Sequence, residues 1–209
     1  MMANLELPLL KGAVEKEKGV FVISKGAKAE IRALLSGGEA KLRLILEENA
    51  SLSLRSESSG ASSLTIDCAL AGAHASVDIT NVCRAEKKNS QKSVTNVLHS
   101  APHTRSIVSS RGVAWDSAAV ELSGLAKIER SAPGSVSRVE CKALVMGDGA
   151  KARADPLLEI LNNDVDCSHA ASVSEIEKGK VFYLQTRGMS EEEAKKMIVD
   201  GFLGTESGD

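Results

Sequence analysis

Residues 41–70 read K-L-R-L-I-L-E-E-N-A-S-L-S-L-R-S-E-S-S-G-A-S-S-L-T-I-D-C-A-L, and apolar residues alternate with polar ones through much of this stretch. Leu42, Leu44 and Leu46 lie on one face of a strand, because successive strand side chains point to opposite sides. Similar short runs recur as far as Cys141, with turn-type residues between them. This patterning predicts strands with one buried face, and therefore a mainly β protein.

The spacing of the strands fits two β architectures. Strand centres lie about a dozen residues apart, and few helical patterns intervene. Ser, Ala and Gly are abundant, as expected where coils stack closely. A β-sandwich and a β-solenoid both have these features, so periodicity leaves both open.

Length and charge exclude several classes of protein. The 209 residues suit one domain or one domain with an appendage. The 26 basic and 28 acidic residues give a net charge of −2, which does not favour nucleic acid or an anionic membrane as a partner. Aromatic residues make up 2% of the chain, which disfavours sites built on base or sugar stacking.

The four cysteines, at positions 68, 83, 141 and 167, are too few for a disulfide scaffold in a chain of this length. The first residues lack the basic and apolar regions of a secretory signal. No apolar run approaches the ~18 residues of a membrane span. We therefore expect a soluble cytoplasmic protein whose thiols are free to bind metal.

Both ends of the chain differ from the β-rich middle. Residues 1–18 are charged and weakly patterned, and we expect an irregular or briefly helical lead-in. Ser190 and Glu193 form a capping-box pattern before an amphipathic run that includes Met197 and Phe202, with Gly201 near its end. The sequence thus predicts a β core over 19–170 and a helical region over 171–209.

The residues that could carry chemistry lie mainly between Cys141 and His169. Thiolate and imidazole suit zinc, copper or iron–sulfur chemistry, and Cys167 and His169 would share one strand face. Taken alone, the pair fits a packed cysteine and a hydrogen-bonded histidine better than it fits a metal site. We interpret Cys68 and Cys83 as core residues. The chain has neither a glycine-rich phosphate loop nor a nucleophile elbow.

His99 and His103 form a second candidate pair, in H-S-A-P-H-T. Their spacing would suit two metal ligands on a helix, but the intervening Pro102 argues against a helix there. We therefore expect a turn role for this pair.

Several stretches together resemble the SufB/SufD family of iron–sulfur cluster assembly proteins. They occur in order along the chain and comprise H-S-A-P-H-T-R-S from His99, C-K-A-L-V-M-G-D from Cys141, P-L-L-E-I-L-N-N-D-V-D-C-S-H from Pro156, F-Y-L-Q-T-R-G-M from Phe182, and the capped helix that ends in G-F-L. Each stretch alone is a weak signal, whereas five in order are specific.

The resemblance implies a fold. It predicts a right-handed parallel β-helix (β-solenoid) core with a short C-terminal α-helical region, and so decides between the two architectures. The family also implies a non-enzymatic scaffold that pairs as a homodimer or as a heterodimer with a paralogue. Such a scaffold builds a transient iron–sulfur cluster near the dimer interface and passes it to apoprotein acceptors.

The resemblance also implies a partner that hydrolyses ATP. The helical region would dock a SufC-like ABC ATPase, and this chain itself would bind no nucleotide. The expected contact residues are Phe182, Tyr183, Leu184, Arg187, Gly188, Met197 and Phe202.

Carried over position by position, the resemblance assigns three metal ligands. Cys141 falls at the cluster-building cysteine of SufB, Cys167 at the SufD-type cysteine, and His169 at a functional histidine of both proteins. Two departures stand out: Ser168 and Ala170 replace the acidic residues that flank the histidine in SufB. The resemblance also leads us to expect a short member without the N-terminal helical region of longer members, and without partners that engage that region, such as a sulfur donor.

Two other functions compete with the scaffold hypothesis. One is a structural or interaction β-solenoid whose cysteines are inert. The other is a β-helical enzyme that acts on polysaccharide, which the scarcity of aromatic residues and the lack of a clear carboxylate pair disfavour.

Overall fold

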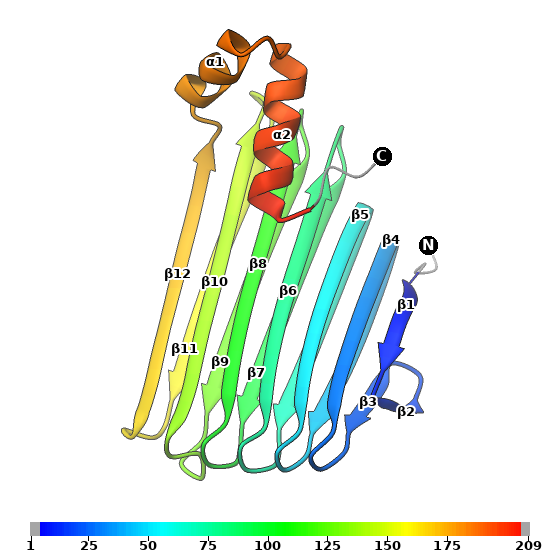
Figure 1. Ribbon diagram of the computed structural model, residues 1–209, viewed down its shortest axis with the longest axis vertical. Coiled ribbons are helices and arrows are strands. Elements are labelled where there is room, and N and C mark those ends of the chain that lie inside the picture. Colours follow the sequence, from blue (N-terminus) through cyan, green and yellow to red (C-terminus); the bar gives the residue numbers. More distant parts are fainter. Residues whose placement is uncertain (1–4, 206–209) are drawn as a thin grey trace.

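Alternating apolar residues line the inside of a parallel β-solenoid of about four turns, shown in Figure 1. The computed structural model describes residues 5–205. The strands are β1 (Leu5–Lys11), β2 (Val14–Glu17), β3 (Val20–Ile23), β4 (Lys28–Leu46), β5 (Ser51–Leu70), β6 (Ser76–Ala85), β7 (Ser90–His99), β8 (Arg105–Trp115), β9 (Ala119–Ile128), β10 (Ser135–Met146), β11 (Lys151–Ile160) and β12 (Val165–Glu175). The helices are α1 (Lys178–Thr186) and α2 (Glu191–Leu203). The expected β-helix with a C-terminal helical region is confirmed.

Each coil contributes one strand to each of two parallel walls. The first half of β5 pairs with β6, its second half pairs with β7, and the walls continue as β6-β8-β10-β12 and β7-β9-β11. The long strands β4 and β5 form a whole coil each because they bend where one wall passes into the other. Gly37 and Gly60 stand at these bends with φ of 91° and 67°, which L side chains rarely adopt.

Residues of successive coils stack in register. Ser51 pairs with Ser76, Ser76 with Arg105, Arg105 with Val136, and Val136 with Asp166. Since strand side chains alternate, each inward position lies beside the inward positions of the neighbouring coils. The alternation in the sequence therefore becomes a continuous core, aliphatic in the coils of β4 and β5 and more polar farther along.

The N-terminal segment is extended, and the expected irregular or briefly helical lead-in is wrong. β1 pairs antiparallel with the first half of β4, and β2 forms an antiparallel pair with β3, which in turn pairs with the second half of β4. Leu5 and Leu7 pack against the core. These strands cover the first open edge of the solenoid, which explains why so charged a segment forms strands.

Helix α2 is fastened to the outside of the solenoid. Its N-terminus has the predicted capping box, in which the Ser190 hydroxyl accepts from the Glu193 backbone N–H (3.2 Å). Val199 and Leu203 pack on apolar side chains of β6, β8 and β10. The helix runs to Leu203, past the expected stop near Gly201, and ends at Gly204 with φ of 62°.

Three arginines hold the C-terminal end of α2. Arg84 pairs with the buried Asp200 (Nη2 to Oδ1, 2.7 Å). Arg111 donates to the Phe202 carbonyl (2.7 Å) and Arg55 to the Gly204 carbonyl (3.2 Å). These contacts satisfy carbonyls that a helix end leaves unpaired, and they place positive charge where the helix dipole is negative.

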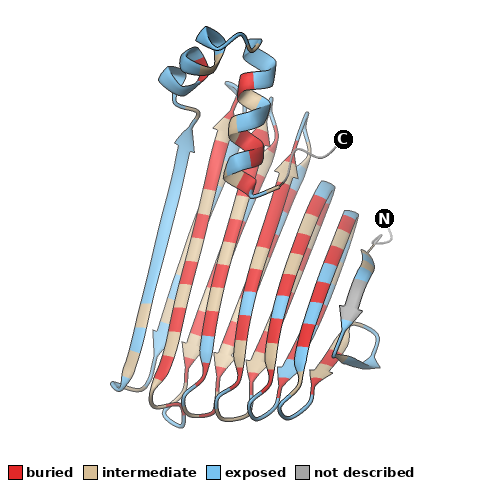
Figure 2. Ribbon diagram, in the orientation of Figure 1, coloured by how far each residue is buried: buried red, intermediate tan, exposed pale blue. Residues whose placement is uncertain are grey.

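The last coil differs from the earlier ones, as Figure 2 shows. β10 alternates buried and half-buried residues, whereas β11 and β12 have no fully buried residue. The reason is topological: within residues 5–205, no further coil stacks on β11 and β12. The inside of the solenoid is therefore open at this end.

Candidate iron–sulfur site

Cys141 lies on β10 and points into the solenoid. Its side chain is fully buried, and its Sγ lies 3.7 Å from the place where a Cβ on Gly124 of β9 would stand. Burial raises the pKa of the Cys141 thiol to about 11, the Asp155 carboxylate adds to the shift, and a hydrogen bond with Ser110 opposes it. At neutral pH the thiol therefore keeps its proton while it is buried beneath the last coil.

Cys167 lies on β12 beside Ser137 of β10 and is half-buried. Burial raises the pKa of the Cys167 thiol, while a backbone hydrogen bond from Ser137 and the nearby Arg138 guanidinium act in the opposite direction. Arg138 itself pairs with Asp166 at 2.6 Å, and this pair holds the pKa of the Asp166 carboxyl below its usual range. The thiol is thus closer to solvent than that of Cys141 and next to a cation.

His169 lies on β12 beside Val139 and is exposed. Its Nδ1 is 3.0 Å from the Pro156 carbonyl oxygen of β11. Since a carbonyl only accepts, Nδ1 carries a proton, and in the neutral ring Nε2 therefore keeps its lone pair. This is the arrangement in which histidine ligates a metal through Nε2.

The three predicted ligands share one face but do not form a closed group. The register places Cys167, His169 and Ala171 of β12 beside Ser137, Val139 and Cys141 of β10. The predicted ligands Cys141, Cys167 and His169 therefore all lie on the inward side of the last coils. Within residues 5–205, no set of three or more His, Cys, Asp or Glu side chains is close enough to hold one metal ion. A complete ligand set would therefore need donors from outside the described chain or movement within it.

Sequence reasoning missed the residues that shape the surroundings of Cys141. Ser110 on β8 is its register neighbour, and Gly124 on β9 leaves room for its side chain. Ser110 also accepts from Asn81 (3.0 Å), whose amide bonds Ser56 and Thr95. No signal in the chain marks these contacts, because the partners are far apart in sequence and meet only when the coils stack.

The remaining cysteines and histidines lie in the core or in a turn, away from the candidate ligands. Cys68 and Cys83 are buried in the core as expected, and burial raises the pKa of each thiol to about 12. His103 stands in a turn, stacked on His74 of the preceding coil with ring centroids 5.1 Å apart. His99 instead ends β7 inside the solenoid and bonds Thr104 and Ser106, both at 2.8 Å.

The predicted contact residues of the helical region fall into two groups. Phe182, Tyr183 and Met197 are exposed, and the Arg187 guanidinium lies over the Tyr183 ring at 5.3 Å from its centroid. Phe202 instead packs on the solenoid near Arg111. Leu184 is half-buried, and Arg187 and Gly188 are exposed at the end of α1.

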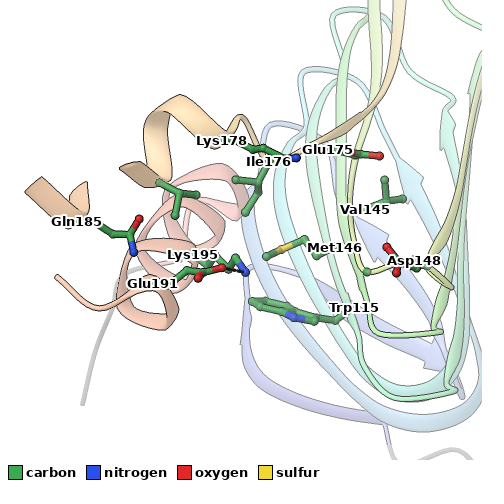
Figure 3. A pocket seen from close by; sticks show the side chains of 13 residues that line it. Trp115, Val145, Met146, Asp148, Glu175, Ile176, Lys178, Gln185, Glu191 and Lys195 are labelled. Atoms are coloured by element: carbon green, nitrogen blue, oxygen red, sulfur yellow. Dashed lines mark ion pairs between the residues drawn. The ribbon is translucent and has the colours of Figure 1, made fainter. Parts of the chain in front are cut away.

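A cavity of about 830 Å³ lies between α1, the first turns of α2 and the adjoining end of the solenoid, shown in Figure 3. Trp115 and Met146 form its wall on the solenoid side, and Gln185, Glu191 and Lys195 face it from the helices. Glu191 and Lys195 are paired with each other. Among the described residues that line it, none is His or Cys, so this cavity is separate from the candidate ligands.

Across residues 5–205, neither helix has the length and apolar character needed to cross a membrane.

Comparison with known proteins connects this fold to a function. Residues 39–202 match the SufBD core domain of the SUF system for FeS cluster assembly. The chain is 34% identical over 164 residues to the iron–sulfur cluster assembly protein SufB of Bacillus subtilis, which covers 77% of this chain and 35% of that protein. It is 33% identical over 137 residues to an iron–sulfur cluster assembly SufBD family protein of Staphylococcus saprophyticus, covering 66% and 30%.

A relative from Mycobacterium bovis, also an iron–sulfur cluster assembly SufBD family protein, is 34% identical over 134 residues and is covered over 16% of its length. The chain thus spans about a third or less of the curated relatives it matches. The family match nevertheless extends from β4 to α2 and includes every coil that carries a candidate ligand. The chain belongs to the SufBD family of iron–sulfur cluster assembly proteins.

Proposed function

We propose that this chain is a scaffold subunit on which a nascent iron–sulfur cluster is assembled and from which it is handed on. The cluster is cargo, held by Cys141, Cys167 and His169 at the open end of the solenoid. ATP hydrolysis takes place in a partner ABC ATPase docked on the helices, and this chain is not itself an enzyme. Apoproteins then receive the cluster.

The open last coil is the observation that carries the proposal. Cys167 and His169 lie on the inward face of β12, where no further described coil covers them, and His169 presents Nε2 as a lone-pair donor. Thiolate and imidazole are established ligands of iron–sulfur clusters. A cluster that must leave again suits few, accessible protein ligands better than a closed four-cysteine cage.

A second subunit would supply what the single chain lacks. β11 and β12 are the two edges of the last coil. Pro156 of β11 has no backbone N–H to donate to a neighbouring strand. β12 contains no proline and could pair with another strand along its whole length. A homodimer or heterodimer joined through this coil would bring further donors to Cys167 and His169.

The burial of Cys141 sets a requirement for the mechanism. Its thiol is fully buried and protonated in the closed structure. It can hold iron only after β11 and β12 move relative to β10, which would admit the metal and lower the pKa of the thiol. We propose that an ATPase bound to α1 drives this opening, because α1 follows β12 directly through Ile176 and Glu177.

The docking surface would be the exposed side of α1 with Met197 of α2. Phe182 and Tyr183 are large aromatic side chains that the described chain leaves in solvent, as are the anchors of many protein interfaces. We expect Phe182→Ala and Tyr183→Ala to weaken co-purification with the ATPase. Val181→Ala on the buried side of α1 is the control that tests loss of helix packing.

The test of cluster binding is anaerobic reconstitution with iron and sulfide, followed by visible absorbance. Wild type should develop a sulfide-to-iron band that Cys141→Ala and His169→Ala reduce, whereas Cys68→Ala should keep it. A band that survives Cys141→Ala but is lost in Cys167→Ala would move the site to the last strand alone. Retention of the band in all ligand variants would refute the assigned ligands.

The burial of Cys141 and the lack of a three-ligand group among the described residues favour one alternative. In it, the chain is a structural subunit that completes a SUF complex without holding a cluster. No band in wild type, even with the ATPase and a SufB-type partner present, would support this alternative.

A further inference from the structure

Three polar atoms buried inside the solenoid have no oxygen or nitrogen hydrogen-bond partner within residues 5–205, and only one of them, Ser93 Oγ, has a weak partner in the Cys83 thiol. They are Ser62 Oγ, Gln91 Oε1 and Ser93 Oγ. All three side chains are at most 7% exposed. A buried polar atom without a partner costs the desolvation free energy of that group, so each case needs an explanation.

The three atoms belong to one patch of the inner wall. Ser62 on β5 and Gln91 on β7 are register neighbours on adjacent strands. Ser93 is the next inward-facing residue along β7. The patch lies just after the bend of β5 at Gly60, beside the first residues of β7.

Backbone carbonyls fix the orientation of the Gln91 amide. Its Nε2 lies 3.2 Å from the Ser58 oxygen, 3.0 Å from the Gly60 oxygen and 2.8 Å from the Arg84 oxygen. Exchanging the two ends of the amide would put Oε1 against three acceptors. Oε1 must therefore point away from these carbonyls, and as a buried acceptor it needs a donor.

The neighbouring polar groups show that the interior otherwise satisfies its hydrogen bonds. The Asn81 amide bonds Ser56 (2.7 Å), Thr95 (2.9 Å) and Ser110 (3.0 Å). The Cys83 thiol forms a weak hydrogen bond with the Ser93 hydroxyl, which leaves that hydroxyl with further hydrogen-bonding capacity. Protein atoms thus do not complete the patch.

We infer that Ser62, Gln91 and Ser93 bind an ordered internal water molecule. The ligand must donate to Oε1 and accept from, or donate to, two hydroxyls that can rotate. Water does both, whereas a simple anion has no proton for Oε1. Three protein partners are also the usual number for a buried water. The Gln91 amide of β7 contacts carbonyls of β5 and β6. The water adds to these contacts and so helps to join the three strands at the bend.

The sign of a stability change tests the inference on the full chain. With water bound, Ser62→Ala or Ser93→Ala removes a partner of the water, and we expect the melting temperature to fall by about 2–4 °C. Without water, each substitution would remove an unpaired buried hydroxyl and raise the melting temperature. Ser53→Ala, on the exposed face of β5, is the matched control and should cause no change.

Coupling between the two serines gives a second readout. If both bind one water, the first substitution empties the site, so the double variant should lose less than the sum of the single losses. A crystal structure should show density within hydrogen-bond distance of all three atoms. A rise in melting temperature in either single variant, or a site without density, would overturn the inference.

Discussion

The closed middle coils and the open last coil have the same alternation and the same register but opposite surroundings. Ile128 of β9 and Ile160 of β11 are register partners on the inward face, yet they are 0% and 44% exposed. His99 is sealed inside the solenoid, whereas His169 reaches solvent. An inward side chain is thus buried only if coils lie on both sides of it. The candidate ligands on β12 are accessible because the described stack ends there.

The largest expected difference between the two regions is in packing energy. Ile128→Ala should lower the free energy of unfolding by about 2–5 kcal/mol, because it leaves a cavity between two coils. Ile160→Ala should cost under about 1 kcal/mol in the isolated chain, since its side chain is already in contact with water. Denaturant unfolding measures both. Equal losses would show that the last coil is closed in solution.

The sealed histidine of the middle coils, His99, should make stability sensitive to acid. Burial lowers the pKa of His99 to about 4, so folding favours its neutral form. The stability that neutral His99 contributes is fully present above the unfolded pKa of about 6.5. As the pH falls toward 4, the free energy of unfolding decreases by about 3 kcal/mol. His99→Gln should flatten the dependence of stability on pH between 6.5 and 4. Denaturant unfolding across this pH range measures the change, and an unaltered loss of stability in His99→Gln would contradict the assignment to His99.

The thiols should react in the order of their accessibility. Cys167 should be alkylated at least about tenfold faster than Cys141 at pH 8, because both the burial and the pKa of Cys141 disfavour its thiolate. Mass spectrometry of the labelled chain follows each position. An ATPase partner with ATP should accelerate Cys141 selectively if it opens the last coil. Acceleration of Cys68 to the same extent would instead indicate general unfolding.

The smallest expected effect concerns the two helices. Asp200 of α2 is buried against Arg84, and a double-mutant cycle of Arg84→Ala and Asp200→Ala should give a coupling of about 1 kcal/mol. The exposed pair of Lys180 and Glu177 near α1 should give a smaller value. Comparable couplings would mean that burial does not strengthen the pair that joins α2 to the solenoid.

The sequence supports the strand pattern well because alternation reports directly which side chains face inward. The capping box at Ser190 is equally local and was predicted to the residue. The lead-in was mispredicted, since its strands exist only because they cover an edge of β4. Helix α1 has no clear amphipathic pattern in the sequence, and Val181 is its only buried residue.

The sequence by itself determined the alternating strands, the ligand-type residues and the family, because side-chain alternation and ordered motifs are properties of neighbours along the chain. Only the tertiary structure decided which of those residues are sealed and which are open. Cys141 and Cys167 are both inward cysteines, but one lies under the last coil and the other forms part of it. Burial, pKa and access depend on the stacking of distant coils, and no local pattern encodes where that stack ends.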